Sequence, residues 1–257
     1  LKQFAPERGV DFSEGPQLPI DPYFLGVWYG DGTKALNGVA VTTMDAEIVA
    51  MCEDVAAAHG LQVRKEDYGW RCPTYHLTRT VASGGNSLLS LMREVCGDAS
   101  CIPRVYLTSS RENRQQLLAG LIDSDGHNNN GCIRIVQRRR QYAEDIAFLA
   151  RSLGLRATLR PKVVNGTTYW RVNMAGDFGD LPIRLARKYP GERKQKKIAT
   201  RTGFSVEAIG YGEYAGFTLD GDGRFLLGDF TVTHNTVAAC SLMADLGVPT
   251  LVIVHKE

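Results

Sequence analysis

The sequence predicts an α+β fold that contains two similar halves and ends in a β-rich segment. A short motif occurs twice, as FLGVWYGDG at 24–32 and as LAGLIDSDG at 118–126. The same order of periodic patterns follows each copy: a strand, an amphipathic helix and two further strands. Near the end of the chain, residues 213–236 read as strands joined by glycine-rich turns. These observations favour an internally duplicated body over a single continuous sheet.

The two motif copies predict a close pair of parallel helices. Alignment of the copies superimposes Gly26 on Gly120 and Asp31 on Asp125. Small residues let two helix backbones approach, and parallel packing would bring both aspartates to one end. The C-terminal end of a helix is partially negative, so carboxylates there need a compensating cation. We expect Gly126 to end the second helix in a left-handed conformation, and Asp123 to be a surface or capping residue.

The repeated order predicts elements of similar length in each half. In the first half, residues 37–44 predict a strand, 45–60 a helix, and 61–70 and 74–82 two strands. In the second half, residues 131–139 predict a strand, 141–154 a helix, and 155–164 and 167–176 two strands. The last two strands are separated by Asn165-Gly166, which strongly favours a tight hairpin.

The formal net charge of +2 conceals an uneven distribution of charge along the chain. Residues 134–201 hold 17 of the 30 Lys and Arg residues but only 5 of the 28 Asp and Glu residues. Such a surplus is the electrostatic signature of a surface that binds duplex DNA, although a solvated basic surface is the alternative. Strand alternation would direct every second side chain toward the DNA. The residues expected to contact it are Arg134, Gln137, Arg139, Arg160, Lys162 and Arg171.

The two motif copies resemble those of the LAGLIDADG homing endonucleases. This resemblance implies two αββαββα-like halves whose saddle-shaped sheets lie on double-stranded DNA, in a monomer with pseudo-two-fold symmetry. It also implies that Asp31 and Asp125 bind Mg²⁺ for phosphodiester hydrolysis. A basic residue beside the metals would assist, with Lys162 and Arg171 as candidates and Lys65 and Arg71 as others. The alternatives are a decayed endonuclease or a non-catalytic nucleic-acid binder, such as a maturase or regulator.

The stretch GFTLDGDGRFLLGDFTVTHNT, residues 216–236, carries a second chemistry. The side-chain amide of Asn235 can attack its own backbone carbonyl and cut the chain, and His234 can donate a proton to the departing amide. The stretch resembles the C-terminal splicing blocks of inteins, the Hint segment. By this resemblance Asn235 cyclises, His234 assists, and Thr236 is the catalytic hydroxyl that opens the downstream host sequence.

This reading predicts four regions. Residues 1–16 are a lead-in from a missing N-terminal intein segment, and residues 17–200 are the endonuclease, with halves 17–110 and 111–200. Residues 201–235 are the splicing segment, and residues 236–257 are the start of the downstream host sequence. The last region resembles the first ATPase motifs of superfamily 2 helicases, which begin with a phosphate-binding loop. We therefore expect the chain to be the C-terminal portion of a longer precursor. Its partners would be the N-terminal intein segment, the flanking exteins and DNA, but no membrane.

Overall fold

The computed structural model describes residues 2–6, 8–12, 16–80, 85–191, 201–203, 205 and 223–234. The first half contains α1 (Pro22–Asp31), β2 (Val39–Thr42), α2 (Ala46–Ala58), β3 (Leu61–Glu66), β4 (Thr74–Arg79) and α3 (Ser87–Cys96). The second contains α4 (Arg104–Leu107), α5 (Arg111–Asp125), β5 (His127–Asn129), β6 (Cys132–Gln137), α6 (Arg140–Ser152), β7 (Arg156–Val164) and β8 (Thr167–Ala175). Four short strands complete the described elements: β1 (Lys2–Phe4), β9 (Arg201–Gly203), β10 (Arg224–Leu226) and β11 (Val232–His234).

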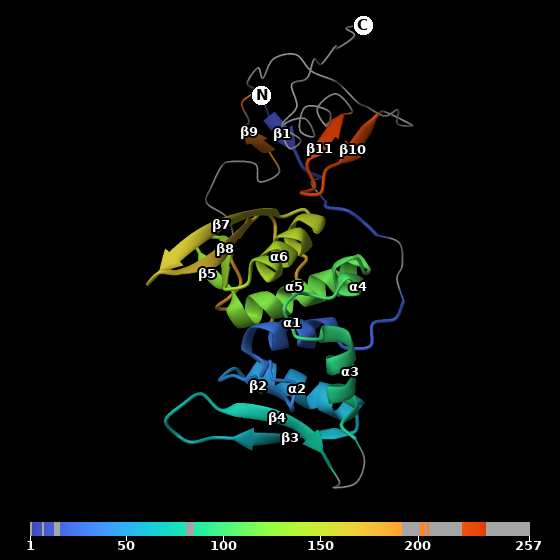
Figure 1. Ribbon diagram of the computed structural model, residues 1–257, viewed down its shortest axis with the longest axis vertical. Helices are drawn as coiled ribbons and strands as arrows, with labels where there is room; N and C mark the ends of the chain where they lie inside the picture. The colour runs from blue at the N-terminus through green and yellow to red at the C-terminus, as the bar shows by residue number, and fades with distance from the viewer. Residues whose placement is uncertain are drawn as a thin grey trace, which may run out of the picture.

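The α+β class is confirmed, and each half has its own antiparallel sheet. The first sheet has the order β2-β4-β3 and the second the order β5-β6-β8-β7. Every helix and strand expected in the two halves is present, whereas α3, α4 and β5 were not expected. The motif helices α1 and α5 lie between the two sheets and run in the same direction, as Figure 1 shows. One continuous apolar core includes residues of both halves.

The contact between α1 and α5 depends on two glycines. A Cβ atom added to Gly26 would lie 2.3 Å from the carbonyl oxygen of Leu117, and one added to Gly120 would lie 2.2 Å from that of Tyr23. Each glycine therefore meets the backbone of the opposite helix directly. This confirms that the paired glycines of the motif permit the two helices to pack closely.

Gly126 does not have the left-handed conformation that we expected at the end of α5. Gly126 has φ −69° and ψ 138°, and Gly32 has φ −88° and ψ 159°, so neither backbone is left-handed. The physical reason for glycine is close approach. A Cβ on Gly126 would lie 2.4 Å from the Ile122 carbonyl oxygen, and one on Gly32 would lie 2.2 Å from the Trp28 ring.

The hairpin between β7 and β8 is the one that the sequence predicts. Asn165 and Gly166 have φ values of 47° and 74°, the two left-handed conformations that a tight two-residue connection requires. Val164 pairs with Thr167, so no further residue separates the strands. The hairpin projects from the second sheet on the side where α1 and α5 end (Figure 1).

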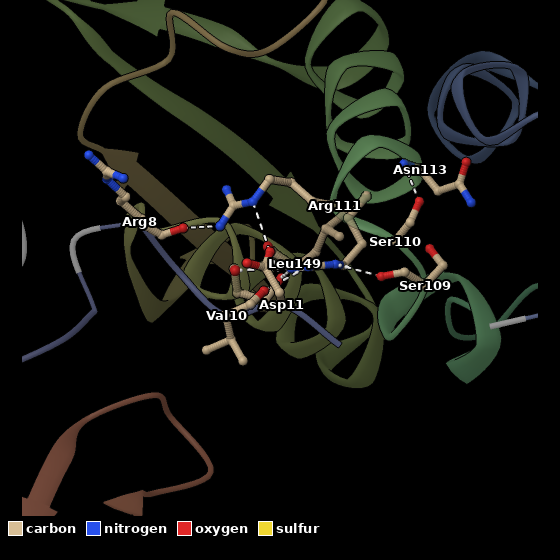
Figure 2. A network of polar contacts seen from close by, with 10 residues as sticks. Arg8, Val10, Asp11, Ser109, Ser110, Arg111, Asn113 and Leu149 are labelled. Carbon is tan, nitrogen blue, oxygen red and sulfur yellow. Dashed lines mark hydrogen bonds and ion pairs between the residues drawn. The ribbon is translucent and has the colours of Figure 1, made fainter. Parts of the chain in front are cut away.

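The described part of the lead-in is tied to the second half of the body. Arg111, in the first turn of α5, donates to the carboxylate of Asp11 at 3.0 Å and to the Arg8 carbonyl (Figure 2). The buried Arg114 donates to the Val10 carbonyl at 2.7 Å. Residues 8–11 are thus held against the start of α5, although the sequence suggested only an extended lead-in.

A third sheet joins the two ends of the described chain. Its order is β10-β11-β1-β9, and β1 pairs directly with β9, with Lys2 opposite Gly203 and Phe4 opposite Arg201. The whole body between residues 16 and 191 is consequently an insertion between two adjacent strands of this sheet. Phe230, in the connection between β10 and β11, packs edge-on against Phe148 of α6, with 4.9 Å between ring centroids.

Within the described residues, no helix is both long enough and apolar enough to cross a membrane. The strand pair expected near the end of the 213–236 stretch corresponds to β10 and β11. Its first strand and turn, and the whole of 236–257, lie outside the described residues.

Substitution of Gly120 by alanine should destabilise the protein by about 1–3 kcal/mol, because the new methyl group would overlap the Tyr23 carbonyl. Alanine is intrinsically the better helix former by about 1 kcal/mol, so a net loss of stability can come only from that overlap. Urea unfolding measures the difference. The control is Gly38→Ala, because a Cβ there meets nothing within 4 Å. Equal stability of the two variants would contradict close helix packing.

Candidate active site at the ends of two packed helices

The structure brings Asp31 and Asp125 together at the C-terminal ends of α1 and α5. A Cβ atom built on Gly30 would lie 2.2 Å from the Ser124 hydroxyl oxygen and 3.3 Å from the Asp125 carboxyl carbon. The last residues of the two helices are therefore in direct contact. The negative ends of two helix dipoles and two carboxylates consequently share one small region.

The electrostatics of this region disfavour two ionised carboxylates. Asp31 is exposed to solvent, yet surrounding protein atoms and the charge of Asp125 raise its pKa. Burial raises the pKa of the partly exposed Asp125, while a hydrogen bond from Gln137 opposes that rise. Such a pair gains stability from any cation that enters between the two carboxylates.

Two lysines, neither of them expected from the sequence, partly supply that positive charge. Lys34 donates to the carbonyls of Trp28 and Gly32 at the end of α1, the second at 3.0 Å. Lys188 donates to the carbonyls of Ser124 and Gly126 at the end of α5, at 2.9 and 2.6 Å. Both ammonium groups lower the pKa of each aspartate. Each motif helix thus has one lysine on its negative end.

The surroundings of the helix ends also lower the pKa of both lysines. Lys34 is exposed to solvent, yet desolvation by surrounding protein atoms lowers its pKa to about 8, although Asp125 and Asp31 oppose the change. Burial, together with the neighbouring charge of Arg187, lowers the pKa of Lys188. Lys34 follows the first motif by two residues and could have been considered on that ground. Lys188 is 62 residues away from Gly126 in sequence, and no local pattern indicates it.

Asp123 positions the segment that carries Lys188. Its side chain is 2% exposed, so the expectation of a surface residue was wrong. Its carboxylate accepts hydrogen bonds from the Tyr23 hydroxyl at 2.6 Å and from the amides of Arg184 and Leu185 at 2.8 and 3.2 Å.

Gln137 does not lie where strand alternation was expected to place it. It donates a hydrogen bond to the Asp125 carboxylate at 2.6 Å from the end of β6. Arg134, three residues earlier, faces the other side of the strand and donates to Asn173 at 3.1 Å. Because strand side chains alternate with a period of two, residues 134 and 137 cannot share a face. Gln137 therefore belongs to the candidate active site.

None of the basic residues that the sequence suggested for this site has a described contact with either aspartate. Lys65 forms an ion pair with Asp67 at 2.7 Å, and the Arg71 guanidinium lies over the Tyr68 ring. Lys162 and Arg171 lie on β7 and β8, opposite Tyr169 and Val136 respectively. Lys34 and Lys188 occupy the position beside the carboxylates instead.

The face of the second sheet opposite α6 is strongly basic. Arg134, Arg160, Lys162 and Arg171 alternate with residues that face the core, and Arg156 follows the same alternation. Arg160 pairs with Arg171 across β7 and β8. The three strands β6, β7 and β8 contain no Asp or Glu. Arg139, by contrast, lies beyond the end of β6 and donates to the Asp98 carbonyl at 3.4 Å.

The corresponding face of the first sheet is polar but less charged. By strand alternation it presents Gln62, Arg64, Glu66 and His76 among other residues. Glu66 and His76 are hydrogen bonded at 2.7 Å, so this carboxylate is partly compensated. The two sheets therefore offer unequal surfaces, as the uneven charge of the sequence suggested.

Of the residues expected to act in splicing, the structure describes His234. His234 is the last residue of that strand and pairs with Arg224 of β10. Asn235 and Thr236 are outside the described residues.

Comparison with known sequences gives a family match for part of the chain. Residues 101–177 match the family model described as homing endonuclease. This segment, about a third of the chain, is similar to homing endonucleases. The matched segment includes Asp125 and Gln137, together with the basic strands β6, β7 and β8.

The chain is also similar to two longer curated proteins. One is the replicative DNA helicase DnaB of Mycobacterium intracellulare, 33% identical over 162 residues, which cover 62% of this chain and 23% of the relative. The other is the homothallic switching endonuclease of Saccharomyces cerevisiae, 24% identical over 255 residues, which cover 83% of this chain and 43% of the relative. The chain spans less than half the length of either relative.

Solved structures of the homing endonuclease I-DmoI are similar at low sequence identity. Mesophilic variants of I-DmoI give a TM-score of 0.43 at 13% identity, covering 60% of this chain and 87% of theirs. The structure of I-DmoI in complex with DNA and Mn gives 0.44 at 12% identity, covering 60% and 88%.

Asp31→Asn should stabilise the protein at neutral pH when divalent cations are removed with EDTA, because it eliminates one charge of a repelling pair. A raised pKa means that the native state binds more protons than the unfolded state between the usual value of 3.8 and the raised value. Stability of the parent chain therefore falls as pH rises through that window, and the variant escapes the loss. Its advantage should shrink as pH approaches 4.

Urea midpoints at neutral pH and near pH 4 measure this effect, with Asp54→Asn as the control. Asp54 is an exposed carboxylate on α2, and its replacement should change stability by less than about 0.5 kcal/mol. An Asp31→Asn protein that is less stable than its parent at neutral pH would show that the carboxylate pair is not repulsive.

Proposed function

We propose that this chain is a LAGLIDADG-type homing endonuclease that cuts both strands of double-stranded DNA as a pseudo-symmetric monomer. The observation that carries the proposal is the meeting of Asp31 and Asp125 at the ends of two parallel, glycine-packed helices. One carboxylate from each half suits a reaction that must occur once on each strand. The family match over 101–177 supports the same conclusion.

The residues at the helix ends fit divalent metal ions, with Mg²⁺ as our choice. Two mutually repelling carboxylates, with raised pKa values and an exposed approach at Asp31, form a set of oxygen donors that a hard cation would stabilise. The described residues contain no group of three or more His, Cys, Asp or Glu side chains that could hold a metal. Mg²⁺ commonly binds through one or two carboxylates, water and substrate phosphates, so this donor set suits a metal shared with DNA. When bound, the metal would supply an activated water and stabilise the leaving oxygen.

The other residues of the site have separate roles in this proposal. Gln137 orients the Asp125 carboxylate through its hydrogen bond. Lys34 and Lys188 hold positive charge beside the position where negative charge develops on the phosphate. A lysine with a pKa of about 8, as at Lys34, can also exchange a proton near neutral pH.

The second sheet would supply most of the affinity for DNA. Arg134, Arg160, Lys162 and Arg171 present positive charge on a face whose strands contain no carboxylate. Neutralisation of phosphates by such residues releases counterions and makes binding strongly dependent on salt. Arg139 lies outside this face, at the start of α6, and would contact DNA only at its margin.

Asp125→Asn should reduce cleavage of a plasmid that carries an uninterrupted helicase gene by about 100-fold or more, because one of two metal-binding carboxylates is lost. Appearance of linear plasmid in Mg²⁺, with an EDTA control, measures the reaction. Asp54→Asn should cleave like the parent, since Asp54 is an exposed residue of α2.

The two alternatives predict other outcomes of the same assay. Binding of the plasmid without metal and without cleavage by the parent chain would favour a non-catalytic nucleic-acid binder or a decayed endonuclease. Equal cleavage by the parent and by Asp125→Asn would reject the assignment of this carboxylate.

We further propose that the endonuclease is inserted in the splicing domain of an intein whose host is a helicase. The topology supports this, since the body lies between the adjacent strands β1 and β9 of a separate sheet. The proposed boundaries remain 1–16, 17–200, 201–235 and 236–257, with β1 in the splicing domain. Similarity to a protein named replicative DNA helicase DnaB supports a helicase host.

Cleavage at the end of the splicing domain follows from Asn235. Its side-chain nitrogen attacks its own backbone carbonyl carbon, the peptide bond to Thr236 breaks, and a succinimide remains. His234 would donate the proton that the departing Thr236 nitrogen takes up.

A chain extended beyond residue 257 should release its downstream portion by cleavage between Asn235 and Thr236, because cyclisation needs only local groups. Intact-mass spectrometry would detect an upstream product with a C-terminal succinimide. Asn235→Ala should release nothing, and His234→Ala should slow release by about 100-fold or more. Release from Asn235→Ala at the same rate as from the parent would reject this chemistry.

A further inference from the structure

The connection between β3 and β4 carries two exposed aromatic side chains at its tip. Trp70 is 79% exposed and Tyr68 is 50% exposed. In contrast, Trp28 is fully buried, and Trp170 is partly buried against the core. Exposure of so large an apolar side chain to water is unfavourable, so Trp70 indicates a surface that another molecule covers.

The tip is an ordered arrangement of aromatic rings and one guanidinium. The Arg71 guanidinium lies 4.0 Å from the centroid of the Tyr68 ring and 5.5 Å from that of Trp70. The two ring centroids are 6.5 Å apart, with an interplanar angle of 51°. We call Tyr68, Trp70 and Arg71 the aromatic tip.

Local contacts fix the aromatic tip before any partner arrives. Gly69 has a φ of 74°, and its amide donates to the Asp67 carboxylate at 2.9 Å. The Tyr68 hydroxyl donates to Glu66, and Lys65 pairs with Asp67 at 2.7 Å. Because these side chains are already ordered, a partner would pay little conformational entropy to bind them.

The two carboxylates beside the tip are paired, and neither is hydrogen bonded to Arg71. Both carboxylates of the connection are engaged, Glu66 by Tyr68 and His76 and Asp67 by Lys65. Hydrogen bonds from these partners hold the pKa of each carboxylate below its usual value. The Arg71 cation lies 3.7 Å from the nearest Glu66 oxygen, beyond hydrogen-bonding distance.

The position of the tip points to DNA as the partner. The β3–β4 hairpin and the β7–β8 hairpin project on the same side of the molecule, the side where α1 and α5 end (Figure 1). DNA at the two aspartates would therefore extend toward both hairpins. Aromatic rings and arginine planes stack on nucleic-acid bases, and this interaction tolerates any base because every base has a π-face.

We propose that the aromatic tip is a stacking platform that contacts the DNA flank on the side of the first sheet. It contacts bases that are unstacked when the DNA bends, while the second sheet binds phosphates through its cations. The two halves thus hold opposite flanks by different chemistry. This inference rests on the proposed function as a DNA endonuclease.

The test is a hydroxyl-radical footprint of the full chain on a duplex that spans the uninterrupted helicase-gene junction. Trp70→Ala should weaken binding roughly 5- to 100-fold, the range expected for loss of stacking on one base, and should remove protection on one flank only. Trp70→Phe retains an aromatic ring and should keep the flank protected. Arg71→Lys retains the charge but loses the planar group, and should resemble Arg71→Ala. Arg160→Ala should weaken protection on the opposite flank.

The outcomes separate this inference from the proposed function. No protection of the duplex by the parent chain at low salt would overturn both. Normal protection by the parent and an identical footprint for Trp70→Ala would overturn the stacking platform alone.

The single exposed tryptophan of the described residues also permits a direct measurement by iodide quenching of fluorescence. Quenching reduced by the duplex in the parent supports the platform, whereas Trp70 equally open to iodide in the complex would exclude DNA and leave a protein partner.

Discussion

The backbone contact between α1 and α5 is the constraint on which the rest of the structure depends. Gly26 and Gly120 leave no room for a Cβ atom, since each would overlap a carbonyl oxygen of the other helix. Parallel packing at this distance places the two helix ends side by side, and each end carries an aspartate. The same contact joins the cores of the two halves into one. A larger residue at either glycine would therefore both move the two carboxylates apart and separate the cores of the two halves.

The close contact brings negative charges together, and nearby positive charges compensate them only in part. Two helix dipoles and two carboxylates make the helix ends strongly negative, and the raised pKa of each aspartate records this. Lys34 and Lys188 reduce the negative charge without occupying the space between the carboxylates, because their ammonium groups bind main-chain carbonyls. Asp123 contributes indirectly by holding the amides of Arg184 and Leu185, from which the chain continues to Lys188. Its burial is thereby explained without a direct part in the site.

The sequence predicts those features that depend on local pattern. The paired glycines, the paired aspartates, the Asn165-Gly166 hairpin and the repeated order of elements could all be read from spacing and periodicity. Contacts between residues distant in sequence could not. Lys188 reaches the site only through the fold. Gln137 was assigned to the wrong face of β6, which strand alternation itself corrects, but its contact with Asp125 follows only from the fold. The left-handed conformation expected for Gly126 failed for a related reason. Glycine is needed there to avoid the Ile122 carbonyl, which sequence pattern does not distinguish from a conformational requirement.

The third sheet imposes a second constraint, because its strands β1 and β9 are connected to the two ends of the body. β1 and β9 are adjacent strands, so the body between them must return its ends to within one strand spacing. The ties of Arg111 and Arg114 to residues 8–11 fix the incoming end against α5, and Phe230 fixes the sheet against α6. These attachments involve only the second half of the body. The first half, with its less basic sheet and its aromatic tip, is held to the rest chiefly through α1. Strain that DNA imposes on the first half would therefore reach the third sheet mainly through the α1–α5 contact, with the Asp45–Arg187 ion pair as a second connection between the halves.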